Sequence, residues 1–174
     1  MYKLFITTLT ANLLLITSLI SISVVSANEL EKAIDTKQEI IIKSQRQAGD
    51  LKNKIASYLD NVRITQGTLE ISADLVQVYQ LEDETETYVA KGKPAVFEQQ
   101  LTDGSKITLQ ANEIIYEPAK HSITISGNAL LRQAGSEVRG NKITYNTLTE
   151  KLEAESNLDE TVTTILKPKQ RAKQ

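Results

Sequence analysis

The chain has 174 residues, with 20 lysines and arginines against 22 aspartates and glutamates, and a formal net charge of −2. This near balance argues against a nucleic-acid partner, because binding to phosphate backbones needs a concentrated basic surface. The sequence contains no cysteine, which excludes disulfides, thiol chemistry and cysteine metal ligands.

Residues 1–27 are typical of a secretory signal peptide. Lys3 supplies a basic start, residues 4–25 are apolar and almost uncharged, and Val25-Ser26-Ala27 offers small residues for cleavage. The apolar run is also long enough to span a membrane as an uncleaved anchor, but the abrupt change to Asn28-Glu29 favours cleavage. We therefore expect an exported protein in which residues 28–166 form one folded domain.

From residue 40 onward, apolar and polar residues alternate, which indicates β-strands. The alternation runs four times into a small residue followed by a polar one. These pairs are Ser44-Gln45, Ala73-Asp74, Ala111-Asn112 and Gly140-Asn141. After each of the last three pairs the apolar residues change parity, so a bend is needed to keep them on one face. The pattern predicts an all-β fold built from repeated antiparallel strand units with corner bends.

Residues that tolerate turns interrupt this alternation at intervals. Glycine and asparagine accept positive φ, and proline fixes a turn. The predicted breaks are Gln66-Gly67-Thr68, Asp103-Gly104-Ser105, Glu117-Pro118, Gly127-Asn128 and Ala134-Gly135-Ser136. Each is expected to separate one strand from the next.

Three segments that end at Gln66, Gln99 and Gln133 share a second alternating pattern. Together with the first pattern, it predicts a set of side chains that point into the sheet interior. These positions are Ile42, Ile64, Phe97, Leu109 and Leu131. Two such aliphatic stripes can line a trough that holds acyl chains without directional contacts. The same stripes also fit a dry hydrophobic core.

Candidate catalytic and metal-binding groups are few. His121 is the only histidine and lies in a predicted turn, and the acidic residues 82–86 fit a solvated loop. A carbohydrate hydrolase would need a pair of carboxylates in a cleft, which the pattern does not indicate. We therefore expect no catalytic residues, no metal, no cofactor and no enzymatic activity.

The order and spacing of three segments resemble the OstA family of lipopolysaccharide transport proteins. The segments are residues 61–74, 92–97 and 130–145, the last with Gly140-Asn141-Lys142-Ile143-Thr144-Tyr145. The resemblance covers nearly the whole chain after residue 28. It implies an open β-jellyroll in the periplasm that carries lipopolysaccharide with the lipid A acyl chains in a hydrophobic groove. It also implies an LptC-like partner at the N-terminal edge, an LptD-like jellyroll at the C-terminal edge, and head-to-tail self-association.

The resemblance also implies a set of groove-lining residues. These are Thr36, Ile40, Phe97, Tyr116 and Pro118, and Pro118 stands where a larger apolar residue is expected. Residues 167–174 are basic and lack apolar content, which predicts a disordered tail. The main alternative function is a secreted β-solenoid that forms a structural filament without lipid cargo. A second alternative is an LptC-like relative, which keeps its N-terminal segment as an anchor.

Overall fold

The computed structural model describes residues 37–80, 82 and 85–167. Within these ranges, ten strands and one short 3-10 turn are formed, so the all-β prediction is confirmed. The elements are β1 (Ile41–Lys43), β2 (Arg46–Asp50), β3 (Ile55–Gln66), β4 (Leu69–Gln80), β5 (Glu86–Gln100), β6 (Lys106–Glu117), η1 (Pro118–Lys120), β7 (Ser122–Gln133), β8 (Ser136–Asn146), β9 (Leu152–Glu155) and β10 (Thr163–Ile165). The predicted signal peptide, Thr36 and all of the predicted tail except Lys167 lie outside the described residues. No helix in the described part of the chain is long and apolar enough to cross a membrane.

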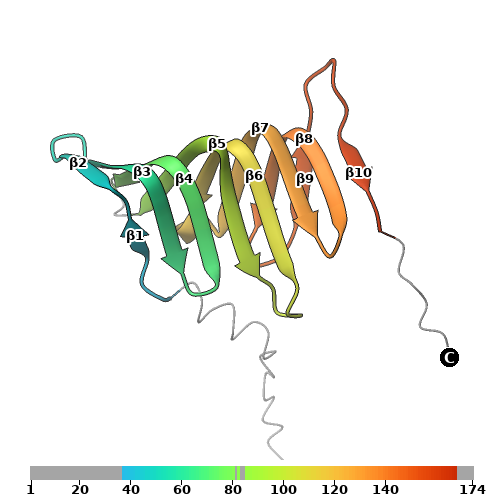
Figure 1. Cartoon of the computed structure of the whole chain (residues 1–174), viewed down its shortest axis with the longest axis horizontal. Helices are drawn as coiled ribbons and strands as arrows, with labels where there is room; N and C mark the ends of the chain where they lie inside the picture. The colour runs from blue at the N-terminus through green and yellow to red at the C-terminus, as the bar shows by residue number, and fades with distance from the viewer. Residues whose placement is uncertain (1–36, 81, 83–84, 168–174) are drawn as a thin grey trace, which may run out of the picture.

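The strands form a single antiparallel sheet that follows the chain from one end to the other (Figure 1). The strand order is β1-β3-β4-β5-β6-β7-β8-β10, with β2 beside β3 and β9 beside β8. The short strands β1 and β2 therefore form one edge, and β9 and β10 form the other. The sheet does not close, because no pairing joins the two edges within the described residues.

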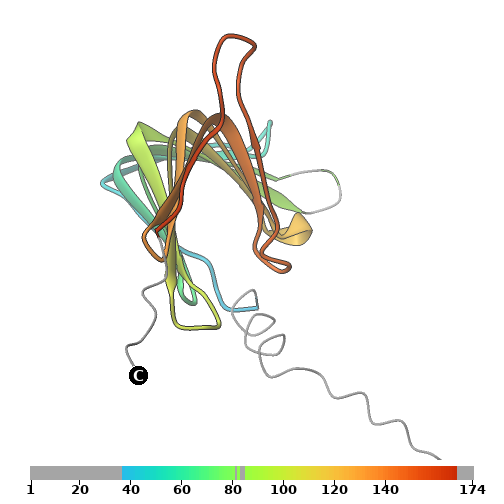
Figure 2. The ribbon, with the colours of Figure 1, turned by 90° about the vertical axis from the view of Figure 1, so that its right-hand side faces the viewer.

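Each long strand bends, and the bends fold the sheet into two walls. Viewed along its length, the sheet is an arch that is open on one side (Figure 2). The pairing register shifts at the predicted corners in β4, β6 and β8, which are Ala73-Asp74, Ala111-Asn112 and Gly140-Asn141. The first predicted corner, Ser44-Gln45, separates β1 from β2. The repeated small-polar pair is thus the sequence signature of the fold line.

The strands between these repeats bend with other residues. In β3 the register shifts around Asp60 and Asn61, which have φ of 63° and 51°, and in β5 it shifts between Lys91 and Ala95. The prediction that Gly127-Asn128 ends a strand is wrong, because β7 continues through it with a register shift. Gly127 and Asn128 have φ of 74° and 56°, and a bulge uses the same positive φ that a turn uses.

The other predicted breaks are turns. Gly67, Gly104 and Gly135 have positive φ and lie in the hairpins β3–β4, β5–β6 and β7–β8. Pro118 begins η1, which connects β6 to β7. Four of the five predicted breaks therefore separate consecutive strands, and the fifth is a corner.

Small residues occupy the fold line across the sheet. Ala95 is paired with Ala111, and Ala129 is paired with Gly140. These three alanines are almost completely buried. A Cβ atom on Gly140 would lie 2.8 Å from the Glu155 carbonyl oxygen of β9. The two walls meet along this line, so small side chains are needed where they converge.

Candidate functional site: the apolar interior

One wall of the interior carries a continuous row of apolar side chains. Consecutive strands pair these residues directly opposite one another, in the order Ile42, Ile64, Ile71, Phe97, Leu109, Leu131 and Val138. Ile64, Phe97 and Leu109 are completely buried, Leu131 nearly so, and Ile42 packs against this core from the edge. All five interior positions predicted from the sequence pattern therefore belong to one row.

The facing wall is apolar with tyrosines near its rim. A middle row consists of Val76, Ala90, Ile114, Ile125 and Ile143. A second row consists of Val78, Tyr88, Tyr116, Ile123 and Tyr145. Tyr116 is 2% exposed, so the change of parity after the third corner does turn it inward.

The remaining residues implied by the resemblance lie at the margins. Ile40 precedes β1 and is half-buried against the core. Pro118 is half-buried in η1, beyond the end of the facing wall, and no residue of that turn is fully buried. Neither residue belongs to the buried interior, whereas Tyr116 does.

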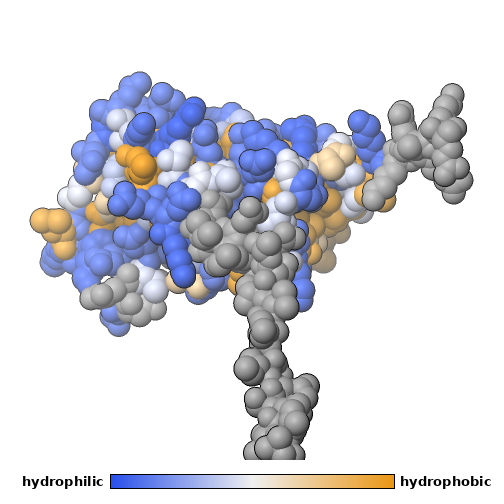
Figure 3. Space-filling view, turned by 90° about the horizontal axis from the view of Figure 1, so that it is seen from below, coloured by the Kyte–Doolittle hydropathy of each residue, from blue (hydrophilic) through white to orange (hydrophobic). Residues whose placement is uncertain are grey.

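The interior is filled in the middle and open at its C-terminal end. A cavity of about 320 Å³ lies among β6, β7, β8, β9 and β10. Its lining consists of Ile107, Leu131, Gln133, Ala134, Ser136, Val138, Tyr145, Glu150, Leu152, Thr164 and Leu166. Apolar surface also gathers at the end of the molecule where these strands lie (Figure 3). Of the predicted site residues, only Leu131 lines this opening. The sequence pattern indicated which side chains face inward, but it gave no signal for an open cavity at this end.

Some polar groups are enclosed with the apolar side chains. Tyr116 Oη donates a hydrogen bond of 2.8 Å to Gln66 Oε1, which joins the two walls through the interior. Tyr88 donates to the Glu86 carboxylate, and its ring lies 5.9 Å from that of Tyr116. Burial raises the pKa of Tyr88 and of Tyr145, in Tyr88 with help from Glu86 and in Tyr145 from Glu150. Both phenols therefore stay protonated and keep a hydrogen that can be donated.

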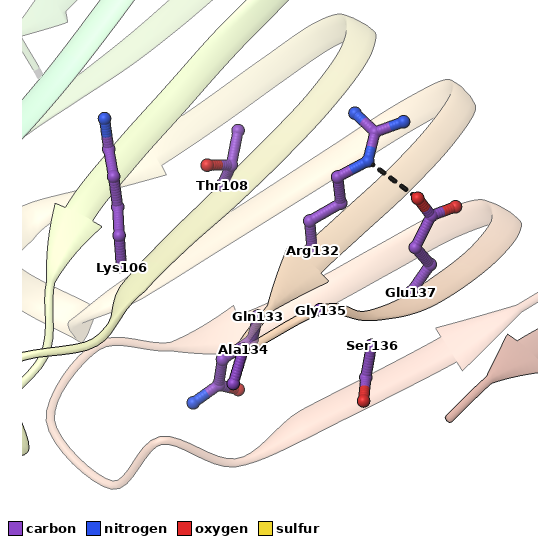
Figure 4. A pocket seen from close by; sticks show the side chains of 8 residues that line it. All are labelled: Lys106, Thr108, Arg132, Gln133, Ala134, Gly135, Ser136 and Glu137. Atoms are coloured by element: carbon purple, nitrogen blue, oxygen red, sulfur yellow. Dashed lines mark hydrogen bonds and ion pairs between the residues drawn. The ribbon is translucent and has the colours of Figure 1, made fainter. Parts of the chain in front are cut away.

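The outer face carries ion pairs around a shallow pocket. The pocket of about 200 Å³ lies at the β7–β8 hairpin, where Arg132 contacts Glu137 at 2.9 Å (Figure 4). Arg139 contacts the same carboxylate at 2.8 Å, and the two guanidinium groups hold the pKa of Glu137 below its usual range. Both arginines and Glu137 are thus members of ordinary solvent-exposed ion pairs, which contribute little to stability.

The single histidine and the carboxylates of the described residues are not gathered into a metal site. His121 is half-buried after η1, with φ of 51° and its backbone N–H bonded to the Pro118 carbonyl. Among the described residues, no group of three or more His, Asp or Glu side chains is placed to hold a metal ion. The distinctive arrangement is instead the enclosed apolar surface between the walls.

Both edges of the sheet expose backbone and apolar side chains. Ile41 of β1 is 50% exposed, and Ile165 of β10 is 51% exposed. Val162 and Leu166 extend the apolar surface beside β10. Edge strands have backbone N–H and C=O groups without a neighbouring strand, so they can accept another strand.

The folded open sheet, its apolar interior and its two free edges define an open β-jellyroll. Residues 41–151 match the family described as LptA/(LptD N-terminal domain) LPS transport protein. A relative in Escherichia coli strain K12, named "Lipopolysaccharide export system protein LptA", is 37% identical over 93% of this chain and 87% of the relative. A relative of the same name in Haemophilus influenzae is 35% identical over 78% of this chain and 81% of the relative. The chain belongs to this family, and the resemblance inferred from the sequence is confirmed.

The fold agrees with a solved structure from Pseudomonas aeruginosa. That protein, LptH, is described as the LptA homologous periplasmic component of the conserved lipopolysaccharide transport device. It superposes with a TM-score of 0.71 at 22% sequence identity, covering 78% of this chain and 99% of LptH. The β-jellyroll prediction is therefore confirmed at the level of the fold.

Proposed function

We propose that this protein is a noncatalytic periplasmic carrier of lipopolysaccharide, which holds the lipid A acyl chains against the apolar row between its walls. The row from Ile42 to Val138 carries this proposal, because it presents an apolar side chain in every strand that it crosses. The names of the relatives support the cargo, and the description of LptH supports the compartment. Tyr116 is proposed to contact the lipid from the facing wall, and Ile40 and Pro118 from the margins. Thr36, which lies outside the described residues, is proposed as a further lipid contact.

The physical basis of binding is the transfer of acyl chains out of water. Each buried methylene contributes about 0.8 kcal/mol, without any directional contact. The centre of the interior is closely packed, so the walls must separate for a chain to pass Phe97. The absence of closing hydrogen bonds between the edges of the described sheet leaves the walls joined chiefly along the fold line. The cavity beside Leu131 is proposed to receive the chain first.

The edges are proposed to connect this protein to related jellyrolls. An LptC-like protein would add its strands at β1 and β2, and an LptD-like jellyroll would add its strands at β9 and β10. Because the two edges differ, one copy can also join the next head to tail without closing a ring. The exposed Ile41 and Ile165 support this arrangement, since strand addition would cover both side chains.

Photocrosslinking in living cells tests the cargo and the groove together. Benzoylphenylalanine at Phe97 is compared with the same residue at Val96, its neighbour on the opposite face of β5. A lipopolysaccharide adduct at Phe97 but not at Val96 is expected. A second strain with the probe at Leu131 samples the open cavity. A folded periplasmic protein with no adduct at either inner position would contradict the proposal and favour the filament with a dry core.

A further inference from the structure

Two buried glutamines and two buried tyrosines occupy equivalent places in the repeats. Gln66 and Gln99 close the same alternating pattern near the ends of β3 and β5. Tyr116 and Tyr145 each lie five residues after the small residue of a corner, in β6 and β8. Tyr116 of β6 therefore lies three strands after Gln66 of β3, and Tyr145 of β8 lies three strands after Gln99 of β5. These are two equivalent glutamine–tyrosine pairs.

The two pairs differ in their hydrogen bonding. The Tyr116 hydroxyl donates to Gln66 Oε1 at 2.8 Å. In the second pair, Gln99 Oε1 and the Tyr145 hydroxyl both have no hydrogen-bond partner among the described residues. Gln99 is 8% exposed and Tyr145 is 2% exposed. Buried polar atoms almost always have a hydrogen-bond partner. Two buried atoms without one, at equivalent positions of the repeat, indicate groups that are available to bind a ligand.

The Tyr145 side chain lines the cavity at the C-terminal end of the interior. The cavity volume of about 320 Å³ admits about ten water-sized groups, because each takes about 30 Å³ in a liquid. Most of the residues that line this cavity are aliphatic, including Leu131, Val138 and Leu152. An occupant that fits this lining is a hydrocarbon chain with one oxygen atom near the phenol.

The hydrogen-bonding capacity of Tyr145 and Gln99 indicates which functional group the ligand chain carries. The Tyr145 hydroxyl can donate to any ligand oxygen, whereas Gln99 Oε1 can only accept. A carbonyl would satisfy the phenol alone. Gln99 is not itself part of the cavity lining, but it is paired directly with Ile107, which is. A hydroxyl can accept from the phenol and donate to an amide oxygen, so a hydroxylated chain matches both groups.

We propose that Tyr145 donates a hydrogen bond to a hydroxyl on the acyl chain of the ligand, so that this end of the interior selects hydroxylated acyl chains over plain ones. This inference rests on the proposed function, because it names the chain chemistry that the same interior prefers. Tyr145 is then a specificity-determining residue, and Gln99 supplies the second contact.

Competitive displacement of N-phenylnaphthylamine from the full mature protein measures this preference. The competitors are 3-hydroxytetradecanoic acid and tetradecanoic acid, which share a carboxylate, so repulsion by Glu150 cancels in the comparison. The wild type is expected to bind the hydroxylated chain about three- to tenfold more tightly, the gain of one net hydrogen bond. Tyr145→Phe is expected to remove the preference while leaving the plain chain bound as before.

Two further variants make the result specific. Tyr79→Phe removes a phenol from the outer face of β4, where it bonds to Gln77 at 3.0 Å, and is expected to keep the preference. Gln99→Met keeps the side-chain length, removes the acceptor and is expected to weaken the preference. Circular dichroism and the unfolding midpoint verify that each variant is folded, since Tyr145→Phe removes no hydrogen bond within the described structure.

The outcomes separate this inference from the proposed function. Equal binding of the two chains by the wild type, or a preference that survives in Tyr145→Phe, would overturn the role of Tyr145. A fall in the unfolding midpoint of ligand-free Tyr145→Phe without a change in preference would also overturn it and assign a structural role. Lipopolysaccharide binding is measured on the same preparations. If the wild type binds lipopolysaccharide but shows no hydroxyl preference, only this inference fails, whereas absent lipopolysaccharide binding contradicts the proposed function.

Discussion

The substitution Leu131→Asp separates the stability of the fold from the binding of lipid. Leu131 is 6% exposed and lines the open cavity, so a carboxylate there reaches water without unfolding the protein. Loss of the buried leucine costs about 2–4 kcal/mol, because similar truncations cost about 2–5 kcal/mol and this site has room to rearrange. A domain of this size unfolds at a cost of about 5–15 kcal/mol, so the variant is expected to stay folded.

Leu131→Asp is expected to weaken lipopolysaccharide binding strongly although the variant stays folded. An acyl chain that enters the cavity would remove water from the new carboxylate, which costs several kcal/mol without a partner. We expect lipopolysaccharide affinity to fall at least about 100-fold, which corresponds to about 2.7 kcal/mol. Titration of fluorescent lipopolysaccharide measures the affinity, and urea unfolding measures the stability.

The neighbouring residue offers a matched control. Leu130 lies on the opposite face of β7 and is half-buried, so Leu130→Asp adds the same charge outside the interior. It is expected to lower stability by about 1 kcal/mol and to leave the affinity within about threefold of the wild type. The reasoning is refuted if folded Leu131→Asp binds lipopolysaccharide as tightly as Leu130→Asp.

Three other substitutions test the fold and its electrostatics. Tyr116→Phe removes the 2.8 Å bond to Gln66 and should lower the free energy of unfolding by about 1–2 kcal/mol in urea; no change would mean that this bond does not join the walls. Gly140→Ala places a Cβ atom 2.8 Å from a β9 carbonyl and should speed amide hydrogen exchange in β9 relative to β4; unchanged β9 exchange would show that the strand can shift without loosening. The pKa of Glu137 is lower in the folded protein than its ordinary value of 4.5. The ionised carboxylate therefore stabilises the fold at pH values above 4.5, and this contribution is lost as the pH falls through the pKa of the folded state. Arg132→Ala should therefore raise the pKa of Glu137 in an NMR titration, and an unshifted pKa would contradict the assigned cause.

The repeated corners and the inner row could be predicted because both depend on local rules. Side chains alternate along a strand, so the parity change after Ala73, Ala111 and Gly140 required a bend wherever both halves were to face inward. The same alternation, without any knowledge of strand pairing, predicts that Ile64, Phe97 and Leu131 lie on one face. The pairing register of β3–β4, β5–β6 and β7–β8 is set by short hairpins, which pair each strand with the next one in the chain.

The features that the sequence did not predict depend on contacts between distant residues. The bend of β3 at Asp60-Asn61 carries no small-polar signature, although asparagine and aspartate accept positive φ. The bond between Gln66 and Tyr116 spans 50 residues and appears only when the walls converge. The filled centre and the open C-terminal cavity likewise result from how closely the two walls approach along the sheet. Alternation specifies which face is inner, but it does not specify the separation of the walls.

The registers explain how an apolar path can extend beyond one copy in the proposed assembly. The inner row begins at Ile42 on one edge and passes from Val138 to Thr164 on the other. If β1 of a second copy pairs beside β10 with inner faces aligned, Ile42 of that copy continues the row after a single threonine. The antiparallel repeat therefore extends this path as well as stabilising the sheet, because every strand of the row except β10 contributes one apolar residue. Open edges and a shared inner face allow the path to grow by whole jellyrolls, which a closed barrel could not do.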